Sequence, residues 1–172
     1  MAPVRANQGL GTSTINVDQV TIELHNPTPP YALVSNAIAF VKTDGTLTAN
    51  YTNVIPGSYY IAVKHRNAIK TWSATTITTS ATPATYDFTT SSNKAFGDNM
   101  IEVEPGIWAF YSGDVVTDDN IDLLDMALLE FDINEFSFGF IETDINGDGN
   151  VDLLDIPVLE NNVNNFIFSE HP

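Results

Sequence analysis

The chain has 172 residues, a length that suits one large domain or two small ones. It contains no cysteine, which excludes disulfide bonds and thiolate metal sites, and no apolar run long enough to insert into a membrane. Its formal net charge of −16 repels phosphates and anionic lipids, so nucleic acid is not an expected partner.

The negative charge is concentrated at one end of the chain. Residues 1–112 carry all six basic residues and seven acids, whereas residues 113–172 contain fifteen acids and no Lys or Arg. This composition shift marks a domain boundary. We predict a flexible leader over residues 1–13, which are small and polar, a β-domain over residues 14–112, and a separate acidic unit over residues 113–172.

Alternating apolar and polar residues after the leader predict β-strands. Val20, Ile22 and Leu24 alternate with polar neighbours, as in a half-buried strand. The turn signals Asp44-Gly45 and Pro56-Gly57 separate further strands. Those strands are predicted at Ala37–Thr43, Thr46–Tyr51, Tyr59–His65, Ile69–Ser73, Thr75–Thr79, Thr85–Phe88, Met100–Val103 and Ile107–Tyr111. Seven or more short strands with frequent turns are typical of an antiparallel β-sandwich.

The stretch over residues 56–65, Pro-Gly-Ser-Tyr-Tyr-Ile-Ala-Val-Lys-His, resembles a strand of transthyretin-like and collagen-binding-B-type Ig-like modules. The resemblance implies an Ig-like sandwich. Lys64, His65 and Arg66, at the end of this strand, are interpreted as a solvated edge. The last predicted strand runs into Gly113 without a flexible linker, so we expect the two halves to dock rigidly.

A calcium loop is predicted in the acidic unit, between Asp144 and Asp155. Oxygen side chains occupy loop positions 1, 3, 5, 7, 9 and 12, and Gly149 at position 6 permits the sharp turn. The six residues are Asp144, Asn146, Asp148, Asn150, Asp152 and Asp155. A solvated acidic turn is the alternative, but it does not explain this register.

A second copy of the loop lies thirty residues earlier in the chain. Its corresponding oxygen residues are Asp114, Asp118, Asn120, Asp122 and Asp125. Val116 occupies position 3 and cannot bind a metal through its side chain, and Asp119 replaces the glycine of position 6. The sequence therefore predicts two calcium sites produced by an internal duplication, the first weaker than the second.

The sequence of the acidic unit also predicts the structure around the two loops. Ile121 and Val151, at position 8 of each loop, are expected to form a β-bridge with each other. Helices are expected from about Leu123 and Leu153, with Pro157 in the first turn of the second. Six apolar residues are expected to pack in the core and between the copies: Phe136, Phe138, Phe140, Phe166, Ile167 and Phe168.

Both loops end in Leu-Leu-Asp, and position 12 is Asp where the familiar EF-hand has Glu. With the thirty-residue offset, this resembles a dockerin-type domain. The resemblance covers residues 113–172 and implies calcium-dependent structure in a secreted or cell-surface protein. In dockerins, loop positions 10 and 11 bind cohesins. Here those positions are Leu123, Leu124, Leu153 and Leu154, which form either a partner surface or part of the packed interior.

The fold class expected is therefore mainly β with a small α segment: an antiparallel Ig-like sandwich followed by a dockerin-like unit. The function expected is a non-catalytic calcium-binding extracellular module for assembly or adhesion, in one version a subunit pairing by strand addition with the leader as donor strand. The N-terminus lacks the apolar core of a signal peptide. A cohesin-binding dockerin module is one alternative.

A carbohydrate-binding sandwich is the other alternative. It would use an aromatic platform drawn from Trp72, Trp108, Tyr31, Tyr59 and Tyr60. An enzyme is not expected, because His25, His65 and His171 are scattered and no catalytic motif accompanies them.

Overall fold

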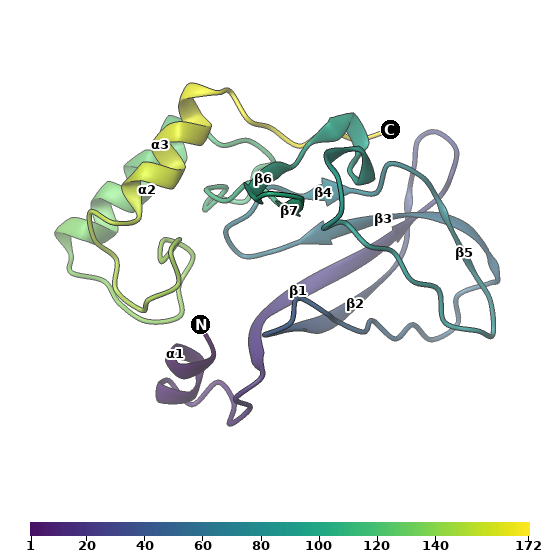
Figure 1. Cartoon of the computed structure of the whole chain (residues 1–172), viewed down its shortest axis with the longest axis horizontal. Helices are drawn as coiled ribbons and strands as arrows, with labels where there is room; N and C mark the ends of the chain where they lie inside the picture. The colour runs from purple at the N-terminus through teal and green to yellow at the C-terminus, as the bar shows by residue number, and fades with distance from the viewer.

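An antiparallel sheet fills the N-terminal half of the chain in the computed structural model, which describes all 172 residues (Figure 1). Its strands are β1 (Asn16–His25), β2 (Leu33–Lys42), β3 (Gly57–Lys64), β4 (Thr71–Trp72) and β5 (Ile77–Thr79). The order is β2-β1-β3-β4, and β5 also pairs with β3. The prediction of a mainly β, antiparallel chain is confirmed.

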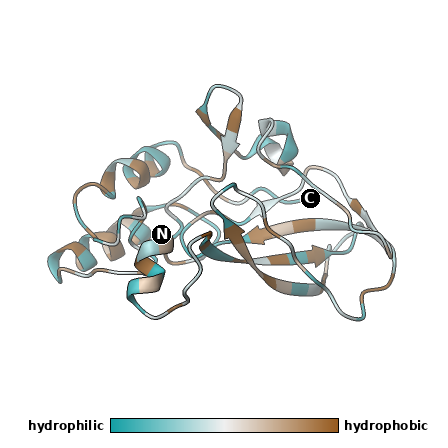
Figure 2. Cartoon of the chain, turned by 60° about the horizontal axis from the view of Figure 1, so that its bottom comes forward, coloured by the Kyte–Doolittle hydropathy of each residue, from teal (hydrophilic) through white to brown (hydrophobic).

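One face of the sheet is buried because its apolar residues alternate along the strands. Val20, Ile22, Ala39 and Val63 form the centre of this core. Figure 2 shows the apolar residues, in brown, recurring along the strands. The register pairs Ile22 with both Ala37 of β2 and Val63 of β3, which places the alternating apolar residues of neighbouring strands on the same side.

The layer that covers this face is irregular. The strands predicted at Thr46–Tyr51 and Thr85–Phe88 are wrong, since neither segment forms a strand. The Thr46 carbonyl oxygen accepts the Lys42 N–H at 2.9 Å, but side chains hold the rest of both segments. Tyr51 donates a hydrogen bond from its hydroxyl to the Ile22 carbonyl oxygen at 3.0 Å, and the Phe88 ring packs edge-on against Phe110. The core therefore lies between a sheet and coil.

Shorter elements complete the β half. Two 3-10 helices, η1 (Ser92–Lys94) and η2 (Phe96–Asp98), precede a two-stranded sheet of β6 (Ile101–Glu104) and β7 (Ile107–Ala109). This sheet corresponds to the last two predicted strands, although β7 ends two residues before the predicted Tyr111.

The N-terminal leader contains a helix, α1 (Ala2–Asn7), which the sequence analysis does not anticipate. A helix of six residues is not stable by itself, so its contacts must hold it. Arg5 is buried, and its guanidinium lies 5.1 Å from the Phe40 ring centre and 4.8 Å from that of Phe140. The helix thus lies between the sheet and the acidic unit.

The acidic unit contains two helices, α2 (Leu123–Asn134) and α3 (Ile156–Asn164). The start of α2 is predicted correctly, and Asp122 and Asp125 form a capping box there. The second helix begins three residues later than predicted, with Pro157 in its first turn as expected. None of the helices is both long and apolar enough to cross a membrane.

The core of the acidic unit includes a residue from the β half. Ile69, in the connection between β3 and β4, is fully buried in one cluster with four residues of the acidic unit. Those four residues are Ile121, Leu129, Val151 and Leu159. The connection between β3 and β4 therefore joins the two halves.

Candidate metal centre

The two predicted loops are related by reciprocal backbone pairing. Asn120 of the first loop forms an antiparallel bridge with Phe168, after the second helix, and Asn150 of the second loop forms the equivalent bridge with Phe138, after the first helix. Asn150 stands thirty residues after Asn120, and Phe138 stands thirty residues before Phe168, so the two bridges are equivalent with the copies exchanged. The sequence duplication therefore has a structural counterpart in which each copy completes the other.

The predicted bridge between Ile121 and Val151 is wrong. The Ile121 N–H donates to the Ile167 carbonyl oxygen at 2.9 Å, and the Val151 N–H donates to the Ser137 carbonyl oxygen at 3.2 Å. These bonds occupy the backbone positions that a direct bridge needs. Both side chains instead pack in the shared core.

The carboxylate at position 12 organises each loop. Both Asp125 and Asp155 are fully buried and accept three backbone N–H bonds, two from positions 2 and 3 and one from position 9. The donors lie 2.8–3.0 Å away in the first loop, and the same range holds in the second. One side chain thus ties the start of its loop to the start of the following helix.

The carboxylate at position 1 is buried in the same way. Asp114 accepts the N–H groups of Asp118 and Asp119 at 3.0 and 3.3 Å, and Asp144 accepts those of Gly147 and Gly149 at 2.9 and 3.1 Å. Burial raises the pKa of Asp114 to about 6. Burial also raises the pKa of Asp144 above its ordinary value.

Negative charge within the first loop also raises the pKa values of its buried carboxylates. Burial raises the pKa of Asp125, and the nearby charge of Asp118 raises it further. Asp125 in turn contributes to the raised pKa of Asp114. Carboxylates that are buried close together resist ionisation unless a cation compensates them.

The loops differ at position 3. The Asn146 side-chain oxygen accepts the Asp148 N–H at 2.8 Å, and its amide donates to the Asp148 carboxylate at 3.2 Å. Asp148 is exposed, and the N–H of Asn150 lowers its pKa. Val116 offers no oxygen at the corresponding place. The second loop therefore has one more side-chain oxygen than the first.

The backbone of the first loop keeps the turn without glycine. Thr117 and Asp119 adopt φ values of 55° and 71°, close to the 80° and 92° of Gly147 and Gly149. Non-glycine residues rarely adopt such angles. The replacement of glycine in the first copy therefore strains the loop without changing its course.

Helix α1 packs directly on the second loop. A Cβ atom at Gly149 would lie 2.9 Å from a methyl group of Val4, so glycine at position 6 is needed for this approach as well as for the turn. The Gln8 side-chain oxygen accepts the Phe140 N–H at 2.7 Å just outside the loop. The leader therefore covers one loop and not the other.

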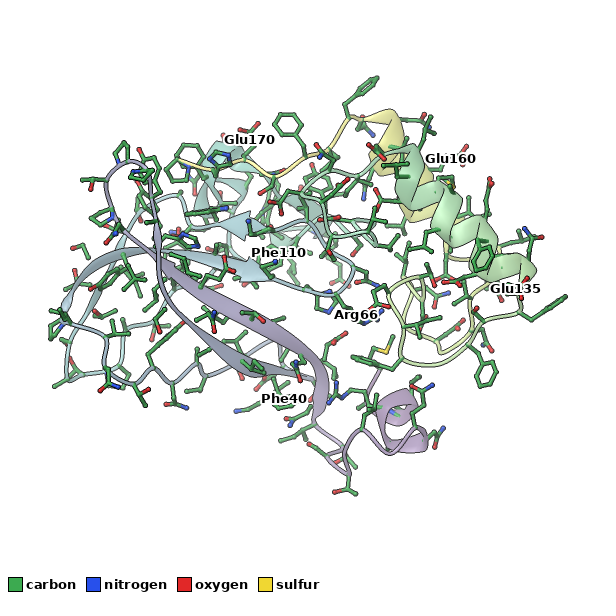
Figure 3. The ribbon with its side chains drawn as sticks, turned by 180° about the vertical axis from the view of Figure 1, so that it is seen from behind. Phe40, Arg66, Phe110, Glu135, Glu160 and Glu170 are labelled. Carbon is green, nitrogen blue, oxygen red and sulfur yellow. The ribbon has the colours of Figure 1, made fainter.

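A cationic residue of the β half also docks on the second loop. Arg66 donates to the carbonyl oxygens of Ile141 and Asp144, the latter at 3.2 Å, and its guanidinium lies 4.8 Å from the Phe140 ring centre. Asn67 donates to the same Asp144 oxygen at 3.1 Å. Figure 3 shows Arg66 between the sheet and the acidic unit.

The interpretation of Lys64, His65 and Arg66 as a solvated edge is wrong for the last two residues. The Asp18 carboxylate accepts Arg66 Nε at 3.2 Å and lies 2.9 Å from His65 Nε2, with all three side chains largely buried. Burial raises the pKa of Asp18, but the hydrogen bond and charge of His65 and the charge of Arg66 outweigh it and leave the pKa lowered.

A different cationic residue, from the connection between β3 and β4, contacts the first loop. Lys70 Nζ lies 3.0 Å from the carboxylate of Asp119, at position 6. Ser169 donates from its N–H to the Asp119 carbonyl oxygen at 2.8 Å and from its hydroxyl to the Lys70 carbonyl oxygen at 2.6 Å. Sequence reasoning missed both cations, because it used the uneven charge distribution only to place a domain boundary.

The oxygen-only donor set of the loops fits Ca²⁺ better than softer metals, which favour His or Cys. Neither loop, however, gathers three His, Asp or Glu side chains at metal-ligand distance. The buried carboxylates hold backbone N–H groups instead. The residues thus fit calcium in their chemistry, although their buried carboxylates are bonded to the backbone of the loops.

Of the two alternatives for the leucines of positions 10 and 11, a packed interior is wrong. Leu123 and Leu153 are 72% and 69% exposed, and Leu124 and Leu154 are also exposed. Leu123 and Leu124 line a groove together with Ile121, Asp122, Val163, Asn164 and Phe166. The leucines therefore form accessible apolar surface beside both loops.

Most of the phenylalanines predicted in the core are also exposed. Phe136 and Phe166 lie two residues after the ends of α2 and α3, with φ near 55°, and their side chains are exposed, as are those of Phe138 and Phe168. Of the six, Ile167 packs against the acidic core, and Phe140 is enclosed between Arg5 and Arg66.

The residues of the alternative functions do not form an evident site. Trp72 and Tyr59 are buried, and Tyr31 packs edge-on against Tyr60, so these four offer little open platform for a sugar. His25, on β1, contacts Glu23 and the Trp72 ring, whereas His65 contacts Asp18.

Comparison of the chain with protein-family models, with curated proteins and with solved structures finds no match.

Proposed function

We propose that this chain is a non-catalytic calcium-binding module that acts in assembly or adhesion outside the cell. In this proposal the acidic unit is dockerin-like and the β half is an Ig-like sandwich with one irregular layer. The observation that carries it is the duplicated loop, in which four carboxylates with almost no exposure stand at positions 1 and 12. These are Asp114, Asp125, Asp144 and Asp155.

Calcium would relieve an electrostatic cost in both loops. Burying carboxylates together is unfavourable because each loses hydration and repels its neighbour, as the raised pKa values of Asp114, Asp125 and Asp144 indicate. A divalent cation compensates two such charges. Its binding free energy then adds to the stability of the folded unit.

The expected ligands are the oxygen residues of each loop. In the second loop they are Asp144, Asn146, Asp148, Asp152 and Asp155, with the backbone carbonyl of Asn150. In the first they are Asp114, Asp118, Asp122 and Asp125, with the carbonyl of Asn120. The first site is weaker because Val116 supplies no oxygen. Extracellular calcium, at about millimolar concentration, suits sites of modest affinity.

The test is a calcium titration by calorimetry on EGTA-treated protein, with thermal melts in parallel. We expect two binding events of unequal affinity and a rise in melting temperature. Asp144→Asn should remove the tighter event. Glu160→Gln is the matched control, because it removes one exposed acid from α3 without touching a loop. No binding at millimolar calcium would contradict the proposal.

The contact surface for a protein partner would be the exposed leucines beside the loops. Their exposed apolar side chains lie in an otherwise strongly acidic unit. This pattern is more typical of a recognition surface than of a surface that contacts only water. A cohesin-type partner is the specific alternative. Binding to a panel of cohesin domains in calcium tests it, and Leu123→Asp combined with Leu153→Asp should abolish any binding that uses this surface.

A further inference from the structure

Arg5 is a buried cation without a counter-ion. Only 8% of its surface is exposed, and none of the four ion pairs of the chain involves it. Its single hydrogen bond runs from Nη2 to the Leu10 carbonyl oxygen at 3.2 Å. A guanidinium has five N–H donors, so most of them make no bond within the chain. Arginine is rarely buried in this way unless a partner satisfies its charge.

The aromatic contacts of Arg5 do not replace such a partner. Its guanidinium lies over the rings of Phe40 and Phe140, and a ring attracts a cation without compensating its full charge. Arg66 lies 4.8 Å from the same Phe140 ring centre, but Asp18 compensates its charge. Of the two cations beside this ring, Arg5 is therefore the uncompensated one.

The guanidinium of Arg5 lines a cavity of about 230 Å³, where the leader meets β1 and β2. This volume is below the range of about 300–1,000 Å³ that is usual for drug-sized ligands, so it suits a molecule the size of one sugar or one amino acid. No acidic residue lines the cavity, although the chain contains 22 acids. The other lining residues are Leu10, Gly11, Thr12, Ser13, Asn16 and Phe40.

The polar groups of this cavity include further free donors. Ser13 Oγ accepts the N–H groups of Ile15 and Asn16 at 3.3 and 3.1 Å, which leaves its own hydrogen free to be donated. The backbone N–H groups of Gly11, Thr12 and Ser13 also make no hydrogen bond within the chain. A cavity that combines one uncompensated cation with free donors favours an anion.

We propose that this cavity binds a small organic carboxylate, with Arg5 as its counter-ion and the Ser13 hydroxyl as a further donor. The two oxygens of a carboxylate match the planar guanidinium and accept paired bonds from it. Its single negative charge equals the single charge of Arg5, whereas phosphate at neutral pH carries more charge than one cation compensates. Leu10 and Phe40 would contact the carbon skeleton. Neither calcium loop takes part in this site.

The acidic unit weakens this site little at physiological salt. Its fifteen acids repel an anion, but at 0.15 M salt charges more than about 8 Å apart are largely screened. The β half, which supplies every lining residue, has six basic residues against seven acids and is nearly neutral. The uncompensated charge of Arg5 therefore dominates inside the cavity.

Titration of ¹⁵N-labelled protein with sodium glucuronate, in millimolar calcium at 0.15 M salt, tests the site by nuclear magnetic resonance. We expect saturable shifts of the Arg5 Nε–H signal and of the amide signals of residues 11–13, with a dissociation constant of about millimolar order. Glucose, a similar ring without the carboxylate, should cause no shift. Inorganic phosphate should bind at least about ten-fold more weakly than the carboxylate.

Two smaller carboxylates identify the source of the ligand. Acetate carries the shared group alone, and N-acetylglycine imitates the carboxyl end of a peptide. Tighter binding of glucuronate than of N-acetylglycine indicates a sugar acid, and the reverse indicates a peptide end. The proposal is overturned if none of the three gives saturable shifts at Arg5 and residues 11–13, or if phosphate binds as tightly as they do.

Two variants separate the cavity from general charge attraction. Arg5→Lys keeps the charge but not the paired donors, so it should weaken carboxylate binding by more than about ten-fold. Lys42→Gln is the matched control, because Lys42 pairs with Asn16 in the sheet but does not line the cavity. Its affinity should stay that of the wild type, and equal weakening by both variants overturns the assignment.

The amide signal of Phe140, whose N–H donates to Gln8, shows whether the leader stays docked in each variant. If Arg5→Lys releases the leader, the wild-type titration still decides the proposal, because it needs no variant.

Discussion

Arg66 donates a hydrogen bond from Nη2 to the backbone carbonyl oxygen of Asp144, 78 residues further along the chain. Asp144 opens the second loop, so a residue at the end of β3 fixes the position of a candidate calcium ligand. The same guanidinium binds Asp18 of β1. The sheet and the second loop are thus held by one side chain.

Replacement of Arg66 should therefore weaken both contacts at once. We expect Arg66→Ala to lower the free energy of unfolding by about 2–3 kcal/mol, because it leaves Asp18 and the Asp144 carbonyl without their charged partner. Arg66→Lys should recover little, since a single ammonium cannot reproduce the branched contacts. Urea denaturation measures both, and Lys64→Ala, which removes an exposed neighbour, should change stability by less than about 0.5 kcal/mol. Equal losses for Arg66→Ala and Lys64→Ala would contradict this role.

The residues at position 3 can be exchanged between the two loops to test their role in calcium binding. Asn146→Val converts the second loop to the pattern of the first and removes the bonds to Asp148. Val116→Asn does the reverse. We expect the first change to weaken the tighter calcium site by about ten-fold or more and the second to strengthen the weaker site. Calorimetry resolves both. If neither affinity moves, position 3 supplies no ligand in either loop.

Short sequence patterns correctly predicted the strands and helices that depend mainly on neighbouring residues. Alternation located β1, because the burial of its side chains repeats every two residues along most of the strand. The loop pattern located α2, since Asp122 and Asp125 form its cap within four residues. The late start of α3 also has a local explanation: Pro157 has no N–H to donate to the Leu153 carbonyl oxygen, so the first bond of a helix starting at Leu153 is missing.

Non-local contacts account for what the sequence did not predict. Nothing near Ile69 in the chain indicates that it belongs to the core of a unit that begins more than forty residues later. Their apolar character likewise suggested that Phe136 and Phe166 are buried, but both side chains are exposed just after the ends of their helices. The segment Thr46–Tyr51 alternates as a strand does, yet it forms no strand and is held mainly by its side chains.

The pH dependence of stability should report the buried carboxylates in calcium-free protein. The pKa of Asp114 is raised from 3.8 to about 6 on folding. Between these values the folded state holds more protons than the unfolded state, so stability should fall as the pH rises through this window and level off above about 6. Asp125 and Asp144 act in the same direction. The pKa of Asp18 is lowered, so the titration of this group changes stability only below about pH 4, outside this window.

Urea denaturation in EGTA at about pH 4.5, 5.5 and 7 measures this slope. Asp114→Asn should reduce it, because the amide does not titrate. Asp44→Asn is the control, since Asp44 is exposed in a turn of the β half and its pKa is lowered by its hydrogen bonds to Thr46. A slope that is unchanged by Asp114→Asn would show that this carboxylate is not the group that titrates.

Ile69 tests whether the two halves fold together. Its side chain is fully buried in the core of the acidic unit, although it belongs to the connection between β3 and β4. Ile69→Ala should cost about 2–5 kcal/mol and Ile69→Val about 0.5–1.5 kcal/mol, because the cavity grows with each methyl group removed. Ile55→Ala, at an exposed position, should change stability by less than about 0.5 kcal/mol. In scanning calorimetry the wild type should unfold in one transition, and Ile69→Ala should lower that transition or split it in two. A variant that melts like the wild type would mean that the halves are stable independently of this contact.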